Sequence, residues 1–383
     1  MSLRALLTAA LITLPAAAIA TGPACPAVRA DAFARQQEIR PLPGALDKVL
    51  MVNDNNPELI RDEGILLSTF PEGGTDALAV PLNGRFDLFS HHVYAGNDDT
   101  LDSTLWLAVM VAPLDGTPVT LELLEGSTSL SQATRPGQTA APFLPLPAFM
   151  RETTEIVAAG PGSRVAGDLL AKRRAPELHT TRWSLEPGDA TPIVVLPIPV
   201  AGLDPLLNGR NLQLRLRSSA PVALATLAAY GSADTPPPTS RWQEMLHSGE
   251  LSSKEHSPTP RGAKGKMVYS RVSGVQIGSS WSTRITDPGS AHLAIPSQPL
   301  SWPISSLERG SLGTGQVQTA ELQAFHPDTA WAAHGNYGVT YDLSLPLSND
   351  GDHPASVELA LESPLKSDQP SDCLLYTSDA ADE

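Results

Sequence analysis

The chain has 383 residues, a formal net charge of −15 at pH 7, and 36 prolines and 29 glycines against few aromatic residues. The acidic balance argues against nucleic acid or an anionic membrane as a partner, because both are negatively charged themselves. Numerous prolines and glycines between short apolar runs are typical of β-strands joined by turns.

Residues 1–20 have the pattern of a secretory signal peptide. Arg4 gives a positive start, Leu6 to Leu14 is apolar, and Ala18-Ile19-Ala20 is a small-residue cleavage site. The apolar stretch is too short for a stable membrane anchor, and no later stretch is long enough to span a bilayer. We therefore expect an exported chain, periplasmic or extracellular, without a membrane span once the signal is removed.

After a flexible lead at 21–36, we predict a first β domain over residues 37–232. Leu105, Leu107, Val109 and Val111 stand at every second position, the turn 113–118 follows, and Val119, Leu121 and Leu123 alternate with Thr120 and Glu122. Two alternating runs around a turn rich in Asp, Gly and Pro predict a β-hairpin.

A second hairpin is predicted from Leu212–Leu216, the turn Ser218–Pro221, and a return strand with Val222 and Leu224. Between the hairpins, Asp168–Ala175 is predicted to form a short helix. Residues 193–196 form a continuous apolar run, which predicts a strand buried on both faces.

Residues 233–262 are predicted to form a proline-rich linker that carries one short helix. Ser240 is its expected N-cap, Gln243 its capping-box partner, and Gly249 stands just beyond its end.

A second β domain is predicted over residues 263–372, ending in a third hairpin. Val339 to Leu347 alternates, a polar turn follows at 348–354, and Val357, Leu359 and Leu361 form the return strand. Residues 373–383 resemble a translated sequencing adapter, although a natural disordered tail is the alternative. If they are an adapter, the second domain is incomplete, and Cys25 alone cannot form an internal disulfide.

Repeated strands with almost no helix predict an all-β protein with two antiparallel, sandwich-like domains. Four segments carry a resemblance to a known family: Gln37–Gly44, Glu63–Pro71, Gly84–Phe89 and His334–Val339. They resemble a family of exported cyanobacterial proteins known as domain of unknown function 3370, over about Gln37 to Leu365. The resemblance implies export and an incomplete C-terminal domain. It implies no activity, ligand or catalytic residue.

The sequence contains none of the common catalytic or cofactor motifs, such as Gly-x-Ser-x-Gly, His-Glu-x-x-His or Cys-x-x-Cys. The most suggestive candidates for a binding site are Asp87, His91, His92 and His334, residue types that zinc accepts as ligands. Adjacent residues of a strand point to opposite faces, so only one of His91 and His92 can face a given site. We favour structural or surface roles for these residues and predict no metal or other cofactor.

Three further patterns have a functional and a structural interpretation. The acidic segments 53–56, 97–102 and 349–352 offer oxygen ligands for calcium but lack calcium-loop spacing, so turns are favoured. The basic run Lys172–Arg174 is interpreted as a solvated helix face. The six tryptophans could stack on sugars, but packing in the core is favoured.

The sequence thus favours a non-catalytic binding or structural module of the periplasm or cell envelope, whose partner would be an envelope protein or a glycan. One alternative is a hydrolase acting on a cell-envelope polymer, with His91, His92 or His334 as acid–base or metal residues. Another is a glycan-binding module.

Overall fold

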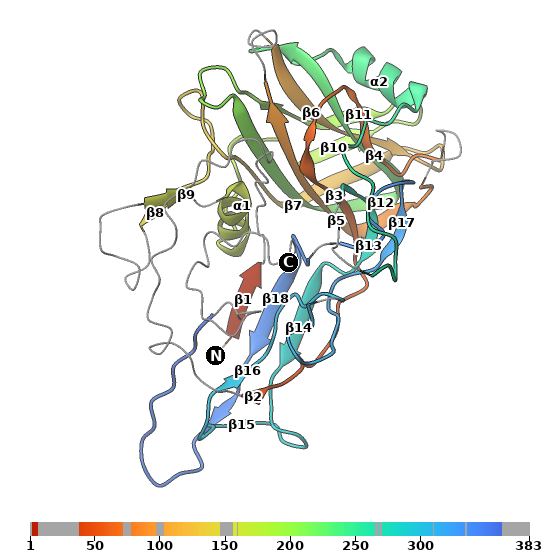
Figure 1. Cartoon of the computed structure of the whole chain (residues 1–383). Helices are drawn as coiled ribbons and strands as arrows, with labels where there is room; N and C mark the ends of the chain where they lie inside the picture. The colour runs from red at the N-terminus through yellow and green to blue at the C-terminus, as the bar shows by residue number, and fades with distance from the viewer. Residues whose placement is uncertain are drawn as a thin grey trace.

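The computed structural model describes residues 2–6, 38–71, 78–96, 103–145, 156–158, 160–264, 268, 270–308, 310–333 and 335–361 (Figure 1). Strands dominate these residues, and the helices are short, which confirms the predicted all-β class. The elements are β1 (Ser2–Leu6), β2 (Glu38–Ile39), β3 (Leu50–Ile60), β4 (Gly64–Ser68), β5 (Leu82–Ala95), β6 (Ser103–Pro113), β7 (Val119–Leu130), β8 (Phe143–Pro145), β9 (Ile156–Ala158), α1 (Pro161–Leu170), β10 (Arg182–Leu185), β11 (Thr191–Ile198), β12 (Leu207–Ser232), α2 (Thr239–Ser248), β13 (Val272–Ile277), β14 (Ser280–Arg284), β15 (Leu293–Ala294), β16 (Leu300–Ser301), β17 (Leu322–Phe325), β18 (Thr340–Ser344) and β19 (Leu347–Ser348).

The largest sheet has ten strands and is organised around β12, which is 26 residues long. The first half of β12 pairs with β5 on one edge and β7 on the other, all antiparallel. Its second half pairs with β4 and β6. The two halves therefore belong to two layers. Layer A follows the order β10-β7-β12-β5-β3-β13-β17, and layer B consists of β11, β6, the second half of β12, and β4.

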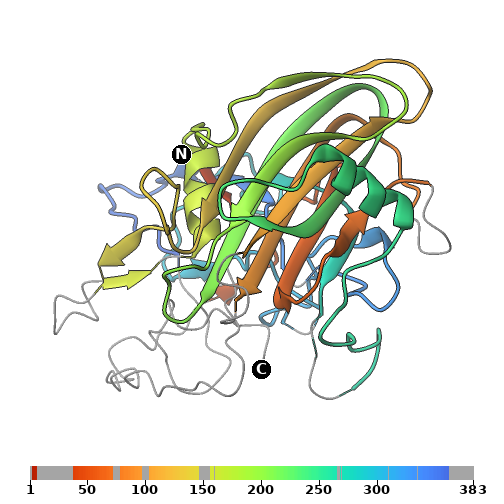
Figure 2. The same cartoon turned by 90° about the horizontal axis from the view of Figure 1, so that it is seen from above.

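The chain passes between the layers at a corner where neighbouring strands bend together. Ladder pairing with β7 ends at Ser218, and pairing with β6 begins at Val222. The loop between β6 and β7 lies against the same place, because the Leu114 N–H donates to the Pro221 carbonyl at 3.0 Å. Figure 2 shows the long strands curving round together. Bends of this kind let one strand serve two packed layers.

Two of the predicted hairpins are therefore wrong, although their strands are where the alternation placed them. β6 and β7 do not pair with each other: each pairs with a different half of β12. The run from Leu212 to Leu224 continues as one strand through the corner and does not fold back. The turn residues at 114–118 and 218–221 bend the strands without reversing them.

The main core lies between the two layers. Leu214 and Leu216 of layer A and Leu224 and Val109 of layer B belong to one buried apolar cluster. Alternation along each strand places these side chains on the inner face, and each buried Val or Leu stabilises the fold by about 1.5–3 kcal/mol.

Helix α2 covers the outer face of layer B (Figure 2). Its buried face consists of Trp242, Met245 and Leu246, which pack on a largely alanine surface that includes Ala108 and Ala225. The helix and its end at Gly249, which has a φ of 69°, confirm the prediction. The predicted cap is wrong: Pro238 is the N-cap residue, no side chain caps the helix, and Gln243 instead donates to the Ala190 carbonyl.

Helix α1 lies earlier than predicted. It spans Pro161–Leu170. The proline in its first turn suits a helix start, because proline lacks an N–H and the first N–H groups of a helix have no intrahelical partner in any case. Asp168, expected at the helix start, is in its last turn. There it accepts hydrogen bonds from Ser127 of β7 and from Arg173 beyond the helix.

A second, three-stranded sheet has the order β1-β18-β14. β18 pairs in parallel with β14 and antiparallel with β1. The third predicted hairpin is not formed: the described residues after β19 contain no further strand, and Leu359 and Leu361 are 50% and 78% exposed. Its first strand is confirmed, with Tyr341 and Leu343 buried against Trp281, Met51 and Phe89.

The ten-stranded sheet contains strands from both sides of the linker predicted at 233–262. β13 and β17 belong to the predicted second domain, yet β13 pairs with β3 and β17 pairs with β13 in layer A. The division into two domains stays a prediction, and residues 21–36 and 373–383 lie outside the described part of the chain.

Candidate functional site

Asp87 lies on the outer face of β5, fully buried under the region that contains β14 and β18. Arg85 donates to both of its carboxylate oxygens at 3.1 Å, and Arg215 of β12 lies 3.9 Å away. Burial raises the pKa of Asp87 to about 6, although both arginines lower it. Burial dominates because the desolvation of a carboxylate costs more than these partners return. Asp87 is thus a buried structural anion.

The adjacent histidines face opposite ways, as the strand geometry predicts. His91 lies 3.5 Å from the Asn211 amide, measured at its Nδ1, whereas His92 Nε2 lies 2.8 Å from Asp54 Oδ2. Both histidines are buried. His334 lies outside the described residues. The structure therefore does not bring Asp87, His91 and His92 together at one open site.

Between the two layers, the inner faces of the strands instead contain a cluster of polar side chains that the sequence pattern did not indicate. Asp54 of β3 accepts hydrogen bonds from both layers: from His92 of β5 and from Thr226 Oγ1 of β12, the latter at 2.5 Å. Asp54 and His92 have no exposed surface. The predicted turn at 53–56 is wrong, because Asn53, Asp54 and Asn55 lie within β3.

This group does not have the order of a catalytic triad. In a triad the histidine stands between the carboxylate and the nucleophile. Here the carboxylate of Asp54 stands between His92 and Thr226, and His92 Nδ1 has no hydrogen-bond partner among the described residues. The neighbouring cavity, lined in part by Ser90, Arg210 and Thr226, measures only about 10 Å³, which is about the space of one water. A polymer substrate cannot enter it.

Arg210 extends the interior polar group across the two layers. Its guanidinium donates to the Pro197 carbonyl at 2.7 Å and to Thr128 Oγ1 at 2.9 Å. Complete burial lowers the pKa of Arg210 to about 10, with Glu177 opposing the shift. The side chain thus remains a cation at neutral pH and fastens the first half of β12 to β11.

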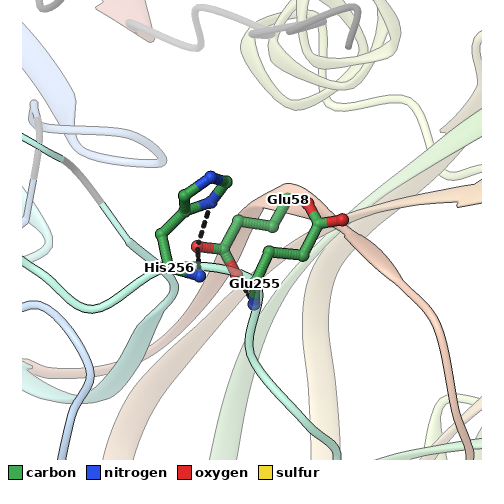
Figure 3. A group of neighbouring side chains, drawn as sticks. All are labelled: Glu58, Glu255 and His256. Atoms are coloured by element: carbon green, nitrogen blue, oxygen red, sulfur yellow. Dashed lines mark hydrogen bonds and ion pairs between the residues drawn. The ribbon is translucent and has the colours of Figure 1, made fainter.

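A third group, which reaches from a buried residue to the surface, has donor types that suit a metal ion. Figure 3 shows Glu58, near the end of β3, beside Glu255 and His256 of the segment that follows α2. One potential ligand atom from each residue lies within 4.8 Å of the others. Two carboxylates and an imidazole are a donor set that zinc accepts.

The contacts of this group favour a structural interpretation. The carboxylate of Glu58 accepts the backbone N–H groups of Glu255 at 2.8 Å and His256 at 3.0 Å. The carboxylate of Glu255 accepts the Leu59 N–H and pairs with Arg61. Both carboxylates are already used as acceptors, so we interpret Glu58, Glu255 and His256 as a latch, hereafter the Glu58 latch, that ties this segment to β3.

A groove of about 520 Å³ lies beside β17, the outer strand of layer A. The described residues that line it are Gly44, Ala45, Leu46, Ile277, Trp281, Gln316, Val317, Gln318, Thr319, Ala320, Glu321, Leu322 and Gln323. Val317 and Ile277 are 48% and 41% exposed. Among these lining residues Glu321 is the one with an ionisable side chain, so the groove suits an uncharged or apolar ligand.

The tryptophans form no open platform among the described residues. Trp106, Trp242 and Trp281 are buried, and their indole N–H groups donate to the backbone carbonyls of Ser232, Pro237 and Pro43. Trp331 is covered on one face by Arg261, whose guanidinium lies 5.0 Å from the ring centre.

Comparison with known proteins places the chain in one family. The model of a family described as a protein of unknown function, DUF3370, matches residues 37–383. The chain belongs to this family. No curated protein and no solved structure matches it. The DUF3370 match begins at the predicted start of the first domain, and it includes residues 373–383. Within the described ranges of this DUF3370 chain, no helix is long and apolar enough to cross a membrane.

Proposed function

We propose that this DUF3370 protein is an exported, non-catalytic binding module of the periplasm or cell envelope, and that the groove beside β17 binds an extended, apolar segment of an envelope protein. The observation that carries this proposal is the contrast between the two kinds of site. The acidic and histidine side chains Asp54, Asp87, His91 and His92 are buried and tied to neighbours. The groove is open and nearly free of charge.

The position of β17 supports a polypeptide as the ligand. β17 is the last strand of layer A; Phe325 at its end is exposed, and so is Glu321, the residue just before the strand. An outer strand can pair with an extended peptide through its backbone, while apolar pockets beside it accept alternate side chains. Val317 and Ile277 supply such apolar surface.

A peptide library tests the groove directly. Apolar heptapeptides with a fluorescent label are screened for binding to the whole protein by fluorescence polarisation. The variant Val317→Asp places a charge in the groove, and Val268→Asp is its control, because Val268 is similarly exposed (42% against 48%) and does not line the groove. We expect the peptides selected on the wild type to bind V268D equally and V317D about tenfold more weakly, a loss of about 1.4 kcal/mol. Equal binding to both variants would exclude the groove.

Export is tested separately. The whole gene is expressed in a Gram-negative host, and the mass of the chain recovered from the periplasm is measured. We expect the mass to correspond to removal of residues 1–20, and we expect Ala18→Arg together with Ala20→Arg to block processing, because the cleavage site requires small residues. An unprocessed chain confined to the cytoplasm would contradict the proposed export.

A further inference from the structure

The edge of β18 is occupied by a strand that export would remove. β1 spans Ser2–Leu6, within the proposed signal peptide, and its ladder with β18 places Leu3 opposite Leu343 and Ala5 opposite Tyr341. On its other edge β18 pairs with β14. Loss of residues 1–20 would therefore leave one edge of β18 without its present partner.

The chain carries a segment with the right pattern to take that place. Val357, Leu359 and Leu361 alternate with Ser356, Glu358 and Ala360, and the three apolar side chains are 48%, 50% and 78% exposed. Alternation of this kind is the pattern of a strand with one buried face, yet among the described residues nothing covers that face.

The turn that would bring this segment back to β18 is already formed. The Asn349 side chain donates to the His353 carbonyl at 2.8 Å, and the Gly351 N–H donates to Asn349 Oδ1 at 3.1 Å. In Figure 1 the trace after β19 reverses and runs in the direction opposite to β18.

Extending an antiparallel ladder from Asn349 and His353 fixes the register. It places Val357 opposite Leu345, Leu359 opposite Leu343, and Leu361 opposite Tyr341. Tyr341 and Leu343 are buried, and Leu345 packs against the same cluster. All three pairs thus lie on the core side, and Leu359 and Leu361 stand where β1 places Leu3 and Ala5. A shift by one residue would turn every apolar side chain outward, so the agreement is specific.

We propose that β1 occupies the β18 edge only in the precursor, and that after removal of residues 1–20 the segment Ser356–Leu361 folds back and pairs with β18. The processed protein then contains the hairpin that its sequence predicts. This inference rests on the proposed export. The interaction surface is the free edge of β18, and the segment that binds it is Ser356–Leu361 of the same chain.

Disulfide cross-linking tests the register in the full chain. Ser344→Cys and Glu358→Cys are introduced together, after Cys25→Ser and Cys373→Ser remove the natural thiols. These positions face each other in the proposed ladder, and an antiparallel pair brings Cβ atoms within disulfide reach. The precursor and the processed chain are oxidised, and the cross-linked fraction is measured by mass spectrometry after denaturation. We expect cross-linking near completion in the processed chain and at background in the precursor.

Two further variants make the result interpretable. Thr340→Cys with Glu358→Cys is out of register and is expected to stay at background. Leu3→Pro with Arg4→Pro removes two adjacent N–H groups of β1, one of which faces β18, and so releases the edge without any processing. We expect the S344C/E358C pair to cross-link in this unprocessed chain.

The outcomes separate this inference from the proposed export. An uncleaved chain in the export experiment contradicts the maturation step, whereas the proline variant still measures the pairing. Background cross-linking in both the processed chain and the proline variant would overturn the pairing. Equal cross-linking with and without β1 would overturn the exchange. A bridge found only between two chains would assign the edge to a second copy and overturn the intramolecular strand.

Discussion

The central strands of the two sheets, β12 and β18, differ in how their edges are filled. β12 has a neighbour on each edge along both of its halves, and these four neighbours come from residues 64–130. β18 has β14 on one edge and Ser2–Leu6 on the other. The central strand of the large sheet is thus paired on both edges by strands that remain after export. One edge of the central strand of the small sheet is paired by a segment that the proposed export would remove.

A polar turn sequence therefore does not by itself determine whether the chain bends or reverses. Similar polar turns follow alternating runs at 114–118, 218–221 and 349–353. The first two bend long strands at the corner, because a layered core on each side holds both halves of β12. The third reverses the chain but leaves the returning segment exposed, since β1 already fills the edge.

The largest effect is expected inside the large sheet. Asp54→Ala removes the acceptor shared by His92 and Thr226, two buried side chains from different layers. We expect a loss of about 3–5 kcal/mol in the free energy of unfolding, as for other broken buried pairs. Asp342→Ala in β18 is the comparison, with an expected loss below about 1 kcal/mol for a partly exposed carboxylate. Urea unfolding measures both, and equal losses would remove the contrast between the two sheets.

The pH dependence of stability sharpens the same contrast. The pKa of Asp87 is about 6 in the folded state and 3.8 as its ordinary value. Between these values the folded protein holds a proton that the unfolded chain has lost, so stability falls as pH rises from 4 to 6. Each pKa unit corresponds to about 1.4 kcal/mol, which gives about 3 kcal/mol in all. The measurement is urea unfolding at pH 4, 5, 6 and 7 for wild type and Asp87→Asn. A wild type that gains stability over the variant in this window would contradict the raised pKa.

A smaller effect is expected at the corner. Gly116 has a φ of 66°, and no atom lies within 4 Å of the place that a Cβ would take, so Gly116→Ala meets backbone strain without a clash. We expect a loss of about 1 kcal/mol. Gly310→Ala is the control, because its φ is not positive and its nearest neighbour is an ordinary contact at 3.6 Å. Thermal unfolding of the two variants distinguishes them, and identical midpoints would show that the corner tolerates another turn.

The smallest effect concerns the exposed segment. In the unprocessed chain Leu359→Ala is expected to cost less than about 0.5 kcal/mol, because Leu359 is half exposed. Leu343→Ala, at a buried position of β18, is expected to cost about 2–5 kcal/mol. Removal of residues 1–20 should raise the cost of L359A and leave that of L343A large. A large loss for L359A in the unprocessed chain would mean that the segment already packs there.

Many elements could be predicted from the sequence, whereas their partners could not. Apolar residues at every second position of Leu105–Val111 and Leu212–Leu216 correctly indicated strands, and Gly249 correctly ended α2. A period of two defines faces but carries no information on which strand lies alongside. The pairing of β6 with β12 joins residues more than a hundred positions apart, and no local signal encodes it.

The candidate residues show the same limit. The opposite orientation of His91 and His92 followed from strand geometry, whereas the partner of His92 did not. Asp54 was hidden because Asn53-Asp54-Asn55 has the composition of a turn, and only burial between the layers makes it a strand. The Glu58 latch joins residues nearly 200 positions apart, so its members could be found only in the folded chain.

The late position of β12 in the chain determines when the protein can fold. β4, β5, β6 and β7 are all synthesised before Leu207, yet each needs β12 as a neighbour. Until about residue 232 has left the ribosome, neither layer can close, and the high contact order makes the final collapse slow. For the proposed export, such a delay would keep the nascent polypeptide loose enough to be threaded through a secretion channel before its layered core becomes too rigid to pass.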